Sequence, residues 1–275
     1  MPPFVKEIIR LALEEDIGTG DVTSGLLIPE DKISRAEIIA KEDMILAGMP
    51  FAREVFRQLD EDVRFKALLK EGSRVKKGKR VAGLKGRARS LLAGERTALN
   101  ILQHLSGIAT RTAKFVREIK GTGASIVDTR KTKPCLRYME KYAVRAGGGK
   151  NHRMALYDGV LIKDNHIEAV GGVKKALALA RAGMHLMKIE IEVKDLKELK
   201  TALEGAADVI MLDNMGLSEI KEAVKINGKK AVLEVSGGVT LENVRKIAQT
   251  GVDLISVGAI THSAPAVDLS MEFIG

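Results

Sequence analysis

The chain has 275 residues, of which 45% are hydrophobic and 29% charged, and its formal net charge at pH 7 is +9. This length fits one barrel-sized unit or two smaller domains, and the composition indicates a soluble protein with enough apolar side chains for a core. The single cysteine, Cys135, excludes an internal disulfide bond and fits a reducing compartment, and no stretch approaches the roughly 18 uninterrupted apolar residues of a transmembrane span.

The high positive charge, with a sequence pI of about 9.5, makes nucleic acid a partner to consider. Against that, the chain has no Trp, only three Tyr and six Phe, so it lacks the aromatic side chains of a base-stacking platform. Eight cationic side chains but one acidic one, Glu140, lie between Thr129 and Tyr157. Such local charge repels itself unless solvent or an anion screens it, so this segment predicts an anionic ligand.

The first segment with a clear pattern, residues 1–16, is predicted to be an amphipathic helix, since apolar and charged residues interleave along it with helical spacing. It lacks the apolar centre of a secretory signal peptide. We therefore expect a cytoplasmic protein.

The segments 32–47 and 63–84 mix short alternating stretches with glycine-rich turns, which indicates an antiparallel α+β unit. A helix is predicted over residues 91–119, and it connects this unit to the second half of the chain. Arg96 and His104 lie on the same face of that helix. His104 in this setting is interpreted as a surface or interface residue rather than a catalyst.

The second half alternates short apolar runs with segments of helical spacing. The apolar runs are 124–127, 159–162, 189–193, 209–212, 231–235 and 254–257. The helical segments are 136–146, 170–182, 196–203, 217–224 and 241–249. Strict alternation predicts βαβ units and a parallel sheet covered on both faces. Because six strands are visible where a complete barrel has eight, we predict an α/β fold with an incomplete, open parallel barrel and an N-terminal α+β domain.

Polar residues interrupt or follow each of these strands. They are Asp128 to Lys131, Lys163 to His166, Glu190 with Glu192, Asp213 with Asn214, Ser236 to Gly238, and Gly258 with Ala259. In parallel α/β barrels the carboxyl ends of the strands form the active face. Strand-to-helix loops are often polar without any function, but polar residues at all six positions predict an active site.

Glycine-containing turns at 236–238 and 258–259 each leave a strand and enter a predicted helix, the first beginning near Thr240. Glycine lets backbone N–H groups approach a ligand, and a helix N-terminus adds positive potential. The last two strand-to-helix loops of a barrel commonly bind phosphate, so a sugar phosphate is the favoured ligand. Two tight turns that need glycine for their own geometry are the alternative.

Three carboxylates are predicted near the same edge. Glu190 and Glu192 lie two residues apart on one strand and point to the same face, while Asp213 ends the neighbouring strand. At a barrel mouth such carboxylates can hold Mg²⁺, directly or through water, or accept hydrogen bonds from sugar hydroxyls. Each could equally be a salt-bridge partner.

The cations of the basic segment and its surroundings fall into two groups. Arg137, Lys141 and Arg145 recur every four residues on a predicted helix, which is typical of a solvated face. The second group, at strand ends or in loops facing the mouth, is Arg130, Lys131, Arg153 and Lys163. Arginine binds carboxylate or phosphate through two parallel hydrogen bonds, so a substrate with several anionic groups is implied.

Two further residues receive structural interpretations. Cys135 falls on the apolar stripe of the predicted helix, and a buried thiol usually serves packing rather than nucleophilic catalysis. His185 follows a helix after a Gly-Met step and is interpreted as structural.

Several longer motifs resemble the quinolinate phosphoribosyltransferase family, also called carboxylating nicotinate-nucleotide pyrophosphorylase. The most specific are Asp128-Thr-Arg-Lys-Thr132, Ala146-Gly-Gly-Gly-Lys-Asn-His-Arg153 and Leu161-Ile-Lys-Asp-Asn-His166. Others are Glu95-Arg-Thr-Ala-Leu-Asn100, Ile210-Met-Leu-Asp-Asn-Met215, Glu234-Val-Ser-Gly-Gly238 and Gly258-Ala-Ile-Thr-His-Ser263. The resemblance covers essentially the whole chain.

The resemblance implies that quinolinate and phosphoribosyl diphosphate react with Mg²⁺ to give nicotinate mononucleotide, diphosphate and CO₂, a step of de novo NAD synthesis. It also implies an N-terminal domain, here residues 1–110 with 264–275 returning to it, and an incomplete barrel over 111–263. The implied assembly is a homodimer or higher homo-oligomer in which one subunit's N-terminal domain covers the neighbour's barrel. No nucleic-acid or membrane partner is expected.

The same resemblance assigns roles to individual residues. Arg130, His152 and Arg153 would bind the two quinolinate carboxylates, and Arg96 would come from the other subunit. The remaining assignments are Thr129 in the substrate pocket, Lys131 and Lys163 between quinolinate and diphosphate, Glu192 and Asp213 at the ribose hydroxyls or the metal, and Ser236, Gly237, Gly238, Val257, Gly258 and Ala259 at the 5-phosphate.

The nearest alternative in this class is a related phosphoribosyltransferase acting on a monocarboxylate such as nicotinate. From a different class, a basic nucleic-acid-binding protein would bind DNA or RNA in a salt-dependent way without turnover. A groove for a phosphate backbone would not carry Glu192 and Asp213, which favours the enzyme. A barrel retained as a noncatalytic binding module predicts the loss of one of these groups, and none is missing.

Overall fold

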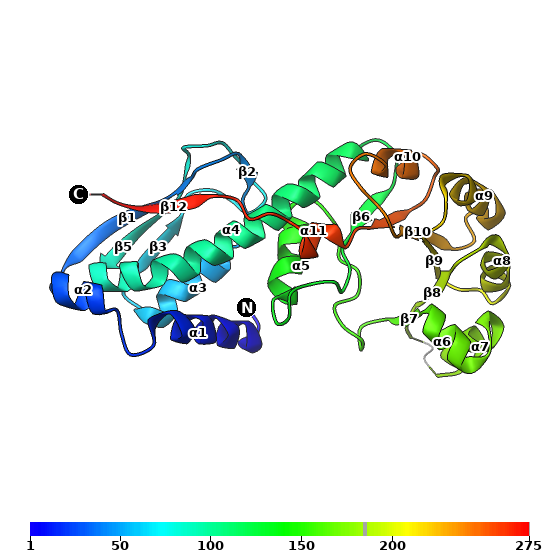
Figure 1. Ribbon diagram of the computed structural model, residues 1–275, viewed down its shortest axis with the longest axis horizontal. Helices are drawn as coiled ribbons and strands as arrows, with labels where there is room; N and C mark the ends of the chain where they lie inside the picture. The colour runs from blue at the N-terminus through cyan, green and yellow to red at the C-terminus, as the bar shows by residue number, and fades with distance from the viewer. Residues whose placement is uncertain (184–185, 275) are drawn as a thin grey trace. The chain divides into compact units, whose positions relative to one another are not determined.

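The computed structural model describes residues 1–183 and 186–274, so the structural role predicted for His185 lies outside the described residues. The chain forms two compact units, whose elements are labelled in Figure 1. The first comprises residues 1–113, 133–148 and 260–275, and the second comprises residues 114–132 and 149–259. Residues 133–148 thus cluster with the first unit, whereas the sequence-based division, which stays a prediction, counts them in the barrel domain.

The first unit is built around a four-stranded antiparallel sheet with the strand order β12-β1-β5-β3. Its elements are α1 (Pro3–Ile17), α2 (Val22–Leu27), β1 (Ile33–Ala40), β2 (Met44–Ile45), α3 (Met49–Leu59), β3 (Arg64–Ala67), β4 (Arg74–Val75), β5 (Arg80–Arg87), most of α4 (Ala88–Glu118), α5 (Arg137–Ala146) and β12 (Leu269–Ile274). The predicted antiparallel α+β unit is confirmed. The edge strand β12 comes from the C-terminal segment and pairs with β1.

The amphipathic pattern of the N-terminal segment explains α1. Val5, Ile9 and Leu13 recur every four residues and are buried, whereas the charged residues between them face solvent. The next helix, α2, begins at a capping residue, because the Asp21 side chain accepts a hydrogen bond from the N–H of Ser24 at 3.0 Å. Local sequence therefore sets both the position and the buried face of these elements.

Helix α5 is buried more completely than its sequence pattern predicts. Lys141, expected on a solvated face together with two arginines, is fully buried. The helix is packed on several sides: the rings of Tyr142 and Phe51 meet edge to face with centroids 5.2 Å apart, and a Cβ at Gly147 would lie 2.4 Å from a carbonyl oxygen of α4. The solvated-face prediction is wrong for Lys141, because the pattern of one helix does not show how many neighbours surround it.

The prediction that Cys135 is buried on the helix is also wrong. Helix α5 begins only at Arg137, so Cys135 lies in the preceding turn, where it is exposed and has a φ of 64°. His104, interpreted as a surface or interface residue, is only 16% exposed, and its Nε2 lies 2.8 Å from Glu140 Oε1. This imidazole is held by a buried carboxylate within the first unit.

The second unit contains a six-stranded parallel sheet with the order β6-β11-β10-β9-β8-β7. Its elements are β6 (Ser125–Val127), β7 (Val160–Ile162), α6 (Asp164–Val170), α7 (Val173–Gly183), β8 (Ile189–Val193), α8 (Leu196–Glu204), β9 (Val209–Asp213), α9 (Leu217–Asn227), β10 (Val232–Ser236), α10 (Val244–Ala248), β11 (Leu254–Ser256) and the start of α11 (Ala259–His262). Within the described residues no pairing joins β6 to β7, so the sheet stays open. The predicted incomplete α/β barrel is confirmed.

The strands of this sheet are buried along most of their length, as their continuous apolar runs predict. Figure 1 shows α7, α8 and α9 side by side, with α8 packed between the other two. Among the described residues, no helix is long and apolar enough to cross a membrane.

Candidate active site

The carboxyl ends of the parallel strands bring several predicted site residues to one edge of the sheet. Asp213 and Ser236 are register partners at the ends of β9 and β10, and Glu192 pairs with Met211 on the other side of β9. Lys163 directly follows β7. Because parallel strands end on the same side, residues far apart in the sequence become neighbours there.

Arg130 and Arg153 lie close together at this edge. Burial lowers the pKa of Arg153 below its usual value and the charge of Arg130 lowers it further, while Glu190 and then Glu192 act in the opposite direction. The Arg153 Nη1 donates a hydrogen bond to the Gly159 carbonyl at 2.8 Å, but its buried Nε donates none among the described residues. Two guanidinium groups close enough to repel each other form a site that a ligand with two carboxylates stabilises.

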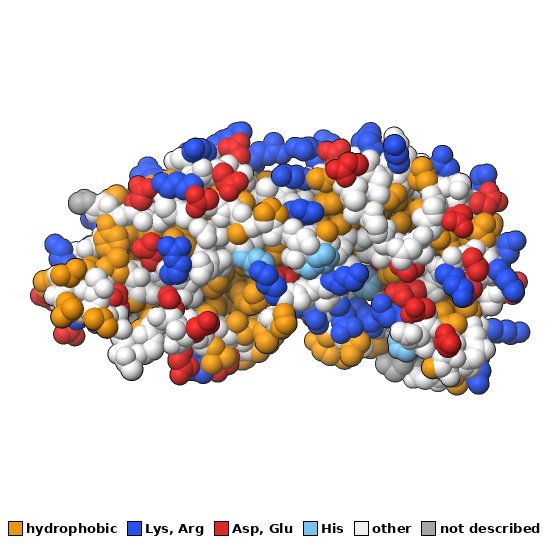
Figure 2. Space-filling view, in the orientation of Figure 1, with side chains coloured by type: hydrophobic (Ala, Val, Ile, Leu, Met, Phe, Trp, Pro, Cys, Tyr) orange, Lys and Arg blue, Asp and Glu red, His pale blue; other side chains and the backbone are white. Residues whose placement is uncertain are grey.

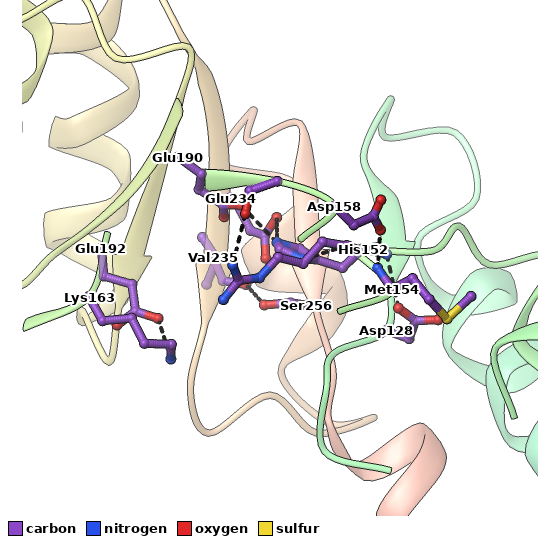
Figure 3. A network of polar contacts seen from close by, with 12 residues as sticks. Asp128, His152, Met154, Asp158, Lys163, Glu190, Glu192, Glu234, Val235 and Ser256 are labelled. Atoms are coloured by element: carbon purple, nitrogen blue, oxygen red, sulfur yellow. Dashed lines mark hydrogen bonds and ion pairs between the residues drawn. The ribbon is translucent and has the colours of Figure 1, made fainter. Parts of the chain in front are cut away.

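The Lys163 side chain reaches Glu192, as Figure 3 shows. Its Nζ lies 2.9 Å from Glu192 Oε1, and the lysine side chain is 46% exposed whereas that of the glutamate is 14% exposed. An ion pair with one exposed partner adds only about 0–1 kcal/mol to stability. The pair is therefore free to rearrange around a ligand at little cost to the fold.

Glu192 and Asp213 line a pocket of about 330 Å³ together with Asp164 and Glu168. Asp213 accepts a hydrogen bond from the Asn214 side chain at 2.9 Å, and its carboxylate is only partly covered. Carboxylate oxygens around a water-accessible pocket are the donors that Mg²⁺ prefers. The residues present therefore fit magnesium.

Asp128, which is fully buried, holds the segment that carries His152 and Arg153 through hydrogen bonds. The Asp128 carboxylate accepts hydrogen bonds from the backbone N–H of His152 at 2.9 Å and from the Asn151 side chain at 2.5 Å. One residue earlier, Lys150 forms an isolated β-bridge with Val127. Asp128 was named among the polar residues at the strand ends but received no individual role, although an acid at the end of a buried strand is a signal that could have identified one.

A second buried cluster lies beside His152 (Figure 3). His152 Nε2 lies 2.8 Å from Glu190 Oε2 and 3.9 Å from Glu234 Oε2. Burial, and then the charge of Glu190, raise the pKa of Glu234 to about 7, while His152 acts in the opposite direction. Glu234 was also missed, and its signal was an acidic residue in the middle of an apolar strand.

The two glycine turns leave adjacent strands, β10 and β11, at the same edge. Gly237 has a φ of 92°, and a Cβ there would lie 2.1 Å from Asn214 Oδ1, so this position requires glycine. The helix expected near Thr240 begins only at Val244, because residues 240–243 form a turn in which Asn243 Oδ1 accepts from the Thr240 N–H. The proposed contribution of that helix N-terminus to phosphate binding loses its basis.

The second glycine turn is held to the first strand of the sheet. The N–H of Val257 donates to the Val127 carbonyl at 3.0 Å, and Val257 is buried. Gly258 and Ala259, which follow it, are half-buried. The two turns therefore offer backbone groups from two neighbouring strand ends.

For three predicted site residues, the structure gives no direct contact with the other residues of the site. Thr129 follows β6 and its hydroxyl accepts a hydrogen bond from the N–H of Lys131 at 3.0 Å, while the Lys131 side chain is exposed. Arg96 lies exposed on α4 in the first unit. The sequence-based roles of these residues stay predictions.

The chain matches two family models in succession. The quinolinate phosphoribosyl transferase N-terminal domain matches residues 21–106, and the C-terminal domain of the same family matches residues 108–272. Together they cover most of the chain.

Known proteins of similar sequence and structure are named nicotinate-nucleotide pyrophosphorylases. A probable carboxylating nicotinate-nucleotide pyrophosphorylase of Bacillus subtilis is 45% identical over 98% of this chain and 93% of its own length. A protein of Methanocaldococcus jannaschii with the same description is 42% identical over 98% of both chains. The solved nicotinate-nucleotide pyrophosphorylase of Francisella tularensis superimposes with a TM-score of 0.96 at 45% identity, covering 100% of this chain and 98% of that one.

Proposed function

The chain belongs to the quinolinate phosphoribosyltransferase family, and from this premise we propose how its residues divide the work of the reaction. The enzyme is a pentosyltransferase. It transfers the phosphoribosyl group of phosphoribosyl diphosphate to quinolinate with decarboxylation, and it yields nicotinate mononucleotide, diphosphate and CO₂ in NAD biosynthesis.

Arg130, His152 and Arg153 form the acid-binding pocket, which receives the two quinolinate carboxylates. The observation that carries this assignment is the pair of neighbouring guanidinium groups at the carboxyl edge of the parallel sheet. The two positive charges repel each other, and the negative charges of a dianion bound between them offset that repulsion. Arginine suits this task because its planar fork matches a carboxylate with two parallel hydrogen bonds.

The phosphoribosyl diphosphate lies beside this pocket. Lys131 and Lys163 contact the diphosphate, and Glu192 and Asp213 accept hydrogen bonds from the ribose hydroxyls or hold a magnesium ion. The 5-phosphate is bound by the backbone of residues 236–238 and 257–259. This arrangement is supported by the common edge on which these strands end and by the glycine that the 237 position requires.

The chemistry needs charge stabilisation rather than a protein nucleophile. When the bond between the anomeric carbon and diphosphate breaks, the ribose acquires oxocarbenium character, which the carboxylates of Glu192 and Asp213 stabilise. Lys163 stabilises the departing anion. Magnesium, when bound, supplies further neutralisation of the diphosphate charge. The quinolinate nitrogen is then bonded to the ribose and carries a positive charge. The ring can therefore accept the electron pair of the C–C bond to the adjacent carboxylate, which leaves as CO₂, and a proton takes its place.

We propose further that the enzyme is a cytoplasmic homodimer or higher homo-oligomer with shared active sites. Arg96 of one subunit completes the acid-binding pocket of the other, which is supported by its exposure on α4. The exposed apolar residues Val22, Leu26 and Leu27 of α2 suit a covered surface in such an assembly. The single cysteine supports the cytoplasmic location.

The test is the formation of nicotinate mononucleotide from quinolinate and phosphoribosyl diphosphate, measured with and without magnesium and with CO₂ release followed in parallel. We expect one CO₂ per nucleotide and activity that depends on magnesium. Turnover of nicotinate but not of quinolinate would identify the monocarboxylate enzyme instead. Salt-sensitive binding to DNA or RNA without any turnover would identify the nucleic-acid-binding alternative.

A further inference from the structure

Asn214 lies between two parts of the proposed site and has no role in the assignments above. It directly follows Asp213, the last residue of β9. Asp213 is the register partner of Ser236, which ends β10 and begins the first glycine turn, residues 236–238. The backbone N–H of Asn214 donates to the Ser236 carbonyl at 2.9 Å, so the contact between the two strand ends continues one residue beyond the strands.

The backbone of Asn214 has a left-handed conformation, with a φ of 54°. Asparagine is one of the few residues other than glycine that adopt this conformation readily, because its short polar side chain can form local hydrogen bonds. The residue type therefore fits a position where the chain turns sharply at the end of a strand and the side chain still meets the neighbouring strand end.

The carboxamide of Asn214 contacts both parts of the site. Its Nδ2 donates a hydrogen bond to Asp213 Oδ2 at 2.9 Å, which orients the carboxylate while its remaining lone pairs can serve a ribose hydroxyl or a magnesium ion. On the other side, a Cβ at Gly237 would lie 2.1 Å from Asn214 Oδ1 and 2.6 Å from Asn214 Cγ. The carboxamide thus occupies the space that a side chain at position 237 would need.

We propose that Asn214 is a positioning residue for phosphoribosyl diphosphate and couples the Asp213 carboxylate to the first glycine turn. One planar carboxamide orients the group that acts on the ribose and supports the backbone that binds the 5-phosphate, so it fixes the two subsites relative to each other. The proposal rests on the assignments of Asp213 and of the first glycine turn made under the proposed function. The competing explanation is that Asn214 only ends β9, a task that glycine would perform equally well.

Asn243 holds the same turn and offers a matched comparison. Its Nδ2 donates to the Gly238 carbonyl at 2.9 Å, and its Oδ1 accepts from the Thr240 N–H at 2.8 Å. Among the residues that the structure describes, Asn243 makes no hydrogen bond with Asp213. Loss of the Asn243 side chain should therefore loosen the turn alone, whereas loss of the Asn214 side chain should disturb both the turn and the carboxylate.

The kinetic test compares these two asparagines. Asn214→Gly keeps the left-handed backbone and removes the carboxamide. We expect its kcat to fall about tenfold and its KM for phosphoribosyl diphosphate to rise about tenfold, because a hydrogen bond to a charged group is lost, while its KM for quinolinate changes by less than about twofold. Asn243→Ala should raise only the KM for phosphoribosyl diphosphate. Glu222→Gln is the control for an unrelated change, since it lies on α9, where Figure 2 shows surface charges of both signs.

Two kinetic outcomes would overturn the proposal. One is a kcat of Asn214→Gly within about twofold of the wild-type value, and the other is the same kinetic pattern in Asn214→Gly and Asn243→Ala. A double-mutant cycle shows whether Asn214 acts through Asp213. We expect Asn214→Gly to lower kcat in the wild-type background and to add almost nothing when Asp213 is already replaced by Asn. Equal effects in both backgrounds would also contradict the coupling.

A second cycle tests the contact with the turn and does not depend on activity. Gly237→Ala should lower the midpoint of urea denaturation by about half as much in the Asn214→Gly background as in the wild type, because the added methyl group then has more room. An unchanged shift would show that the Asn214 side chain does not support the turn.

If Asn214→Gly does not fold, Asn214→Asp replaces it, since it has the same size and tolerates the same φ but cannot donate to Asp213 when ionised, and it predicts the same fall in kcat. Failure of the proposed function is a separate result, because it would be seen as missing turnover of quinolinate by the wild-type enzyme.

Discussion

The Lys163 ammonium group lies 2.9 Å from Glu192 Oε1, so a cation that follows β7 meets a carboxylate near the end of β8. In the proposed reaction, Lys163 stabilises the departing diphosphate and Glu192 stabilises the ribose cation, so the pair brings together the two groups that act on opposite charges. In the absence of substrate each charge is neutralised by the other.

Replacement of Lys163 by Met is expected to lower kcat about 100-fold, because the departing diphosphate loses a positioned charge. The change is measured by steady-state kinetics at saturating concentrations of both substrates. Lys225→Met is the matched control, since Lys225 forms a comparable pair with Glu222 at 3.1 Å on the surface of α9. A kcat for the Lys163 variant within twofold of the control would remove this lysine from the chemical step.

Replacement of Asp213 by Asn is expected to reduce turnover far more than affinity for quinolinate. The substitution keeps the size of the side chain but removes the negative charge that stabilises the ribose cation, an effect of roughly 100-fold on kcat. Quinolinate binding is measured by calorimetry and kcat by product formation. Equal losses of both would place Asp213 outside the phosphoribosyl site.

A mixture of two inactive variants tests the shared active site. Arg96→Ala and Arg153→Ala are each expected to be inactive, and subunit exchange between them should restore about a quarter of wild-type activity, because half the dimers are hybrids with one intact site each. Exchange is confirmed independently with differently tagged chains. Mixtures that exchange subunits but stay inactive would show that Arg96 acts within its own subunit or not at all.

Replacement of Gly237 by Ala is expected to lower stability by about 1–3 kcal/mol, since the added Cβ meets Asn214 and the backbone has a positive φ. The neighbouring Gly238→Ala is the control, because its φ is also positive at 59° but a Cβ there has open space. Urea denaturation compares the two variants, and the KM for phosphoribosyl diphosphate should rise more in the Gly237 variant. The same loss in both variants would mean that strain rather than the contact with Asn214 dominates.

The raised pKa of Glu234 predicts a pH dependence of stability. The ordinary value is 4.5 and the folded value is about 7, so between these values the folded protein binds more protons than the unfolded chain. The contribution of this group is fully present below about pH 4.5 and is lost as the pH rises through about 7. Glu234→Gln should lack this loss, as measured by urea denaturation at several pH values. A variant with an unchanged pH profile would show that Glu234 titrates normally.

The strand and helix pattern of the second unit was predictable because each signal is local. Continuous apolar runs identified β8 (Ile189–Val193) and its neighbours, and the number of runs predicted an open sheet rather than a closed barrel. The same local reasoning failed at α5, where Lys141 is buried, and at Cys135, which lies outside the helix. Helical spacing shows which residues share a face, but it does not show what covers that face.

The candidate site was predictable where residues lie at strand ends, since all parallel strands end at one edge. Arg130 and Lys163 were predicted in this way, and Lys163 lies beside Glu192 because β7 and β8 are neighbours in the sheet. Arg153 was predicted from a loop that precedes β7. The individual roles of Asp128 and Glu234 were missed, because a single acid next to apolar residues has the same sequence pattern whether it is a buried partner or a solvated side chain.

The order of apolar runs, glycine turns and basic motifs along this chain was enough to determine its fold class and its family, because such patterns depend on residue spacing alone. Only the tertiary structure decided that Glu190 and Glu234 lie next to His152, and that Nε2 of its ring faces their carboxyl groups. The physical reason is that the protonation and orientation of a buried group depend on charges and hydrogen bonds from distant segments, and these distances exist only after the strands have paired.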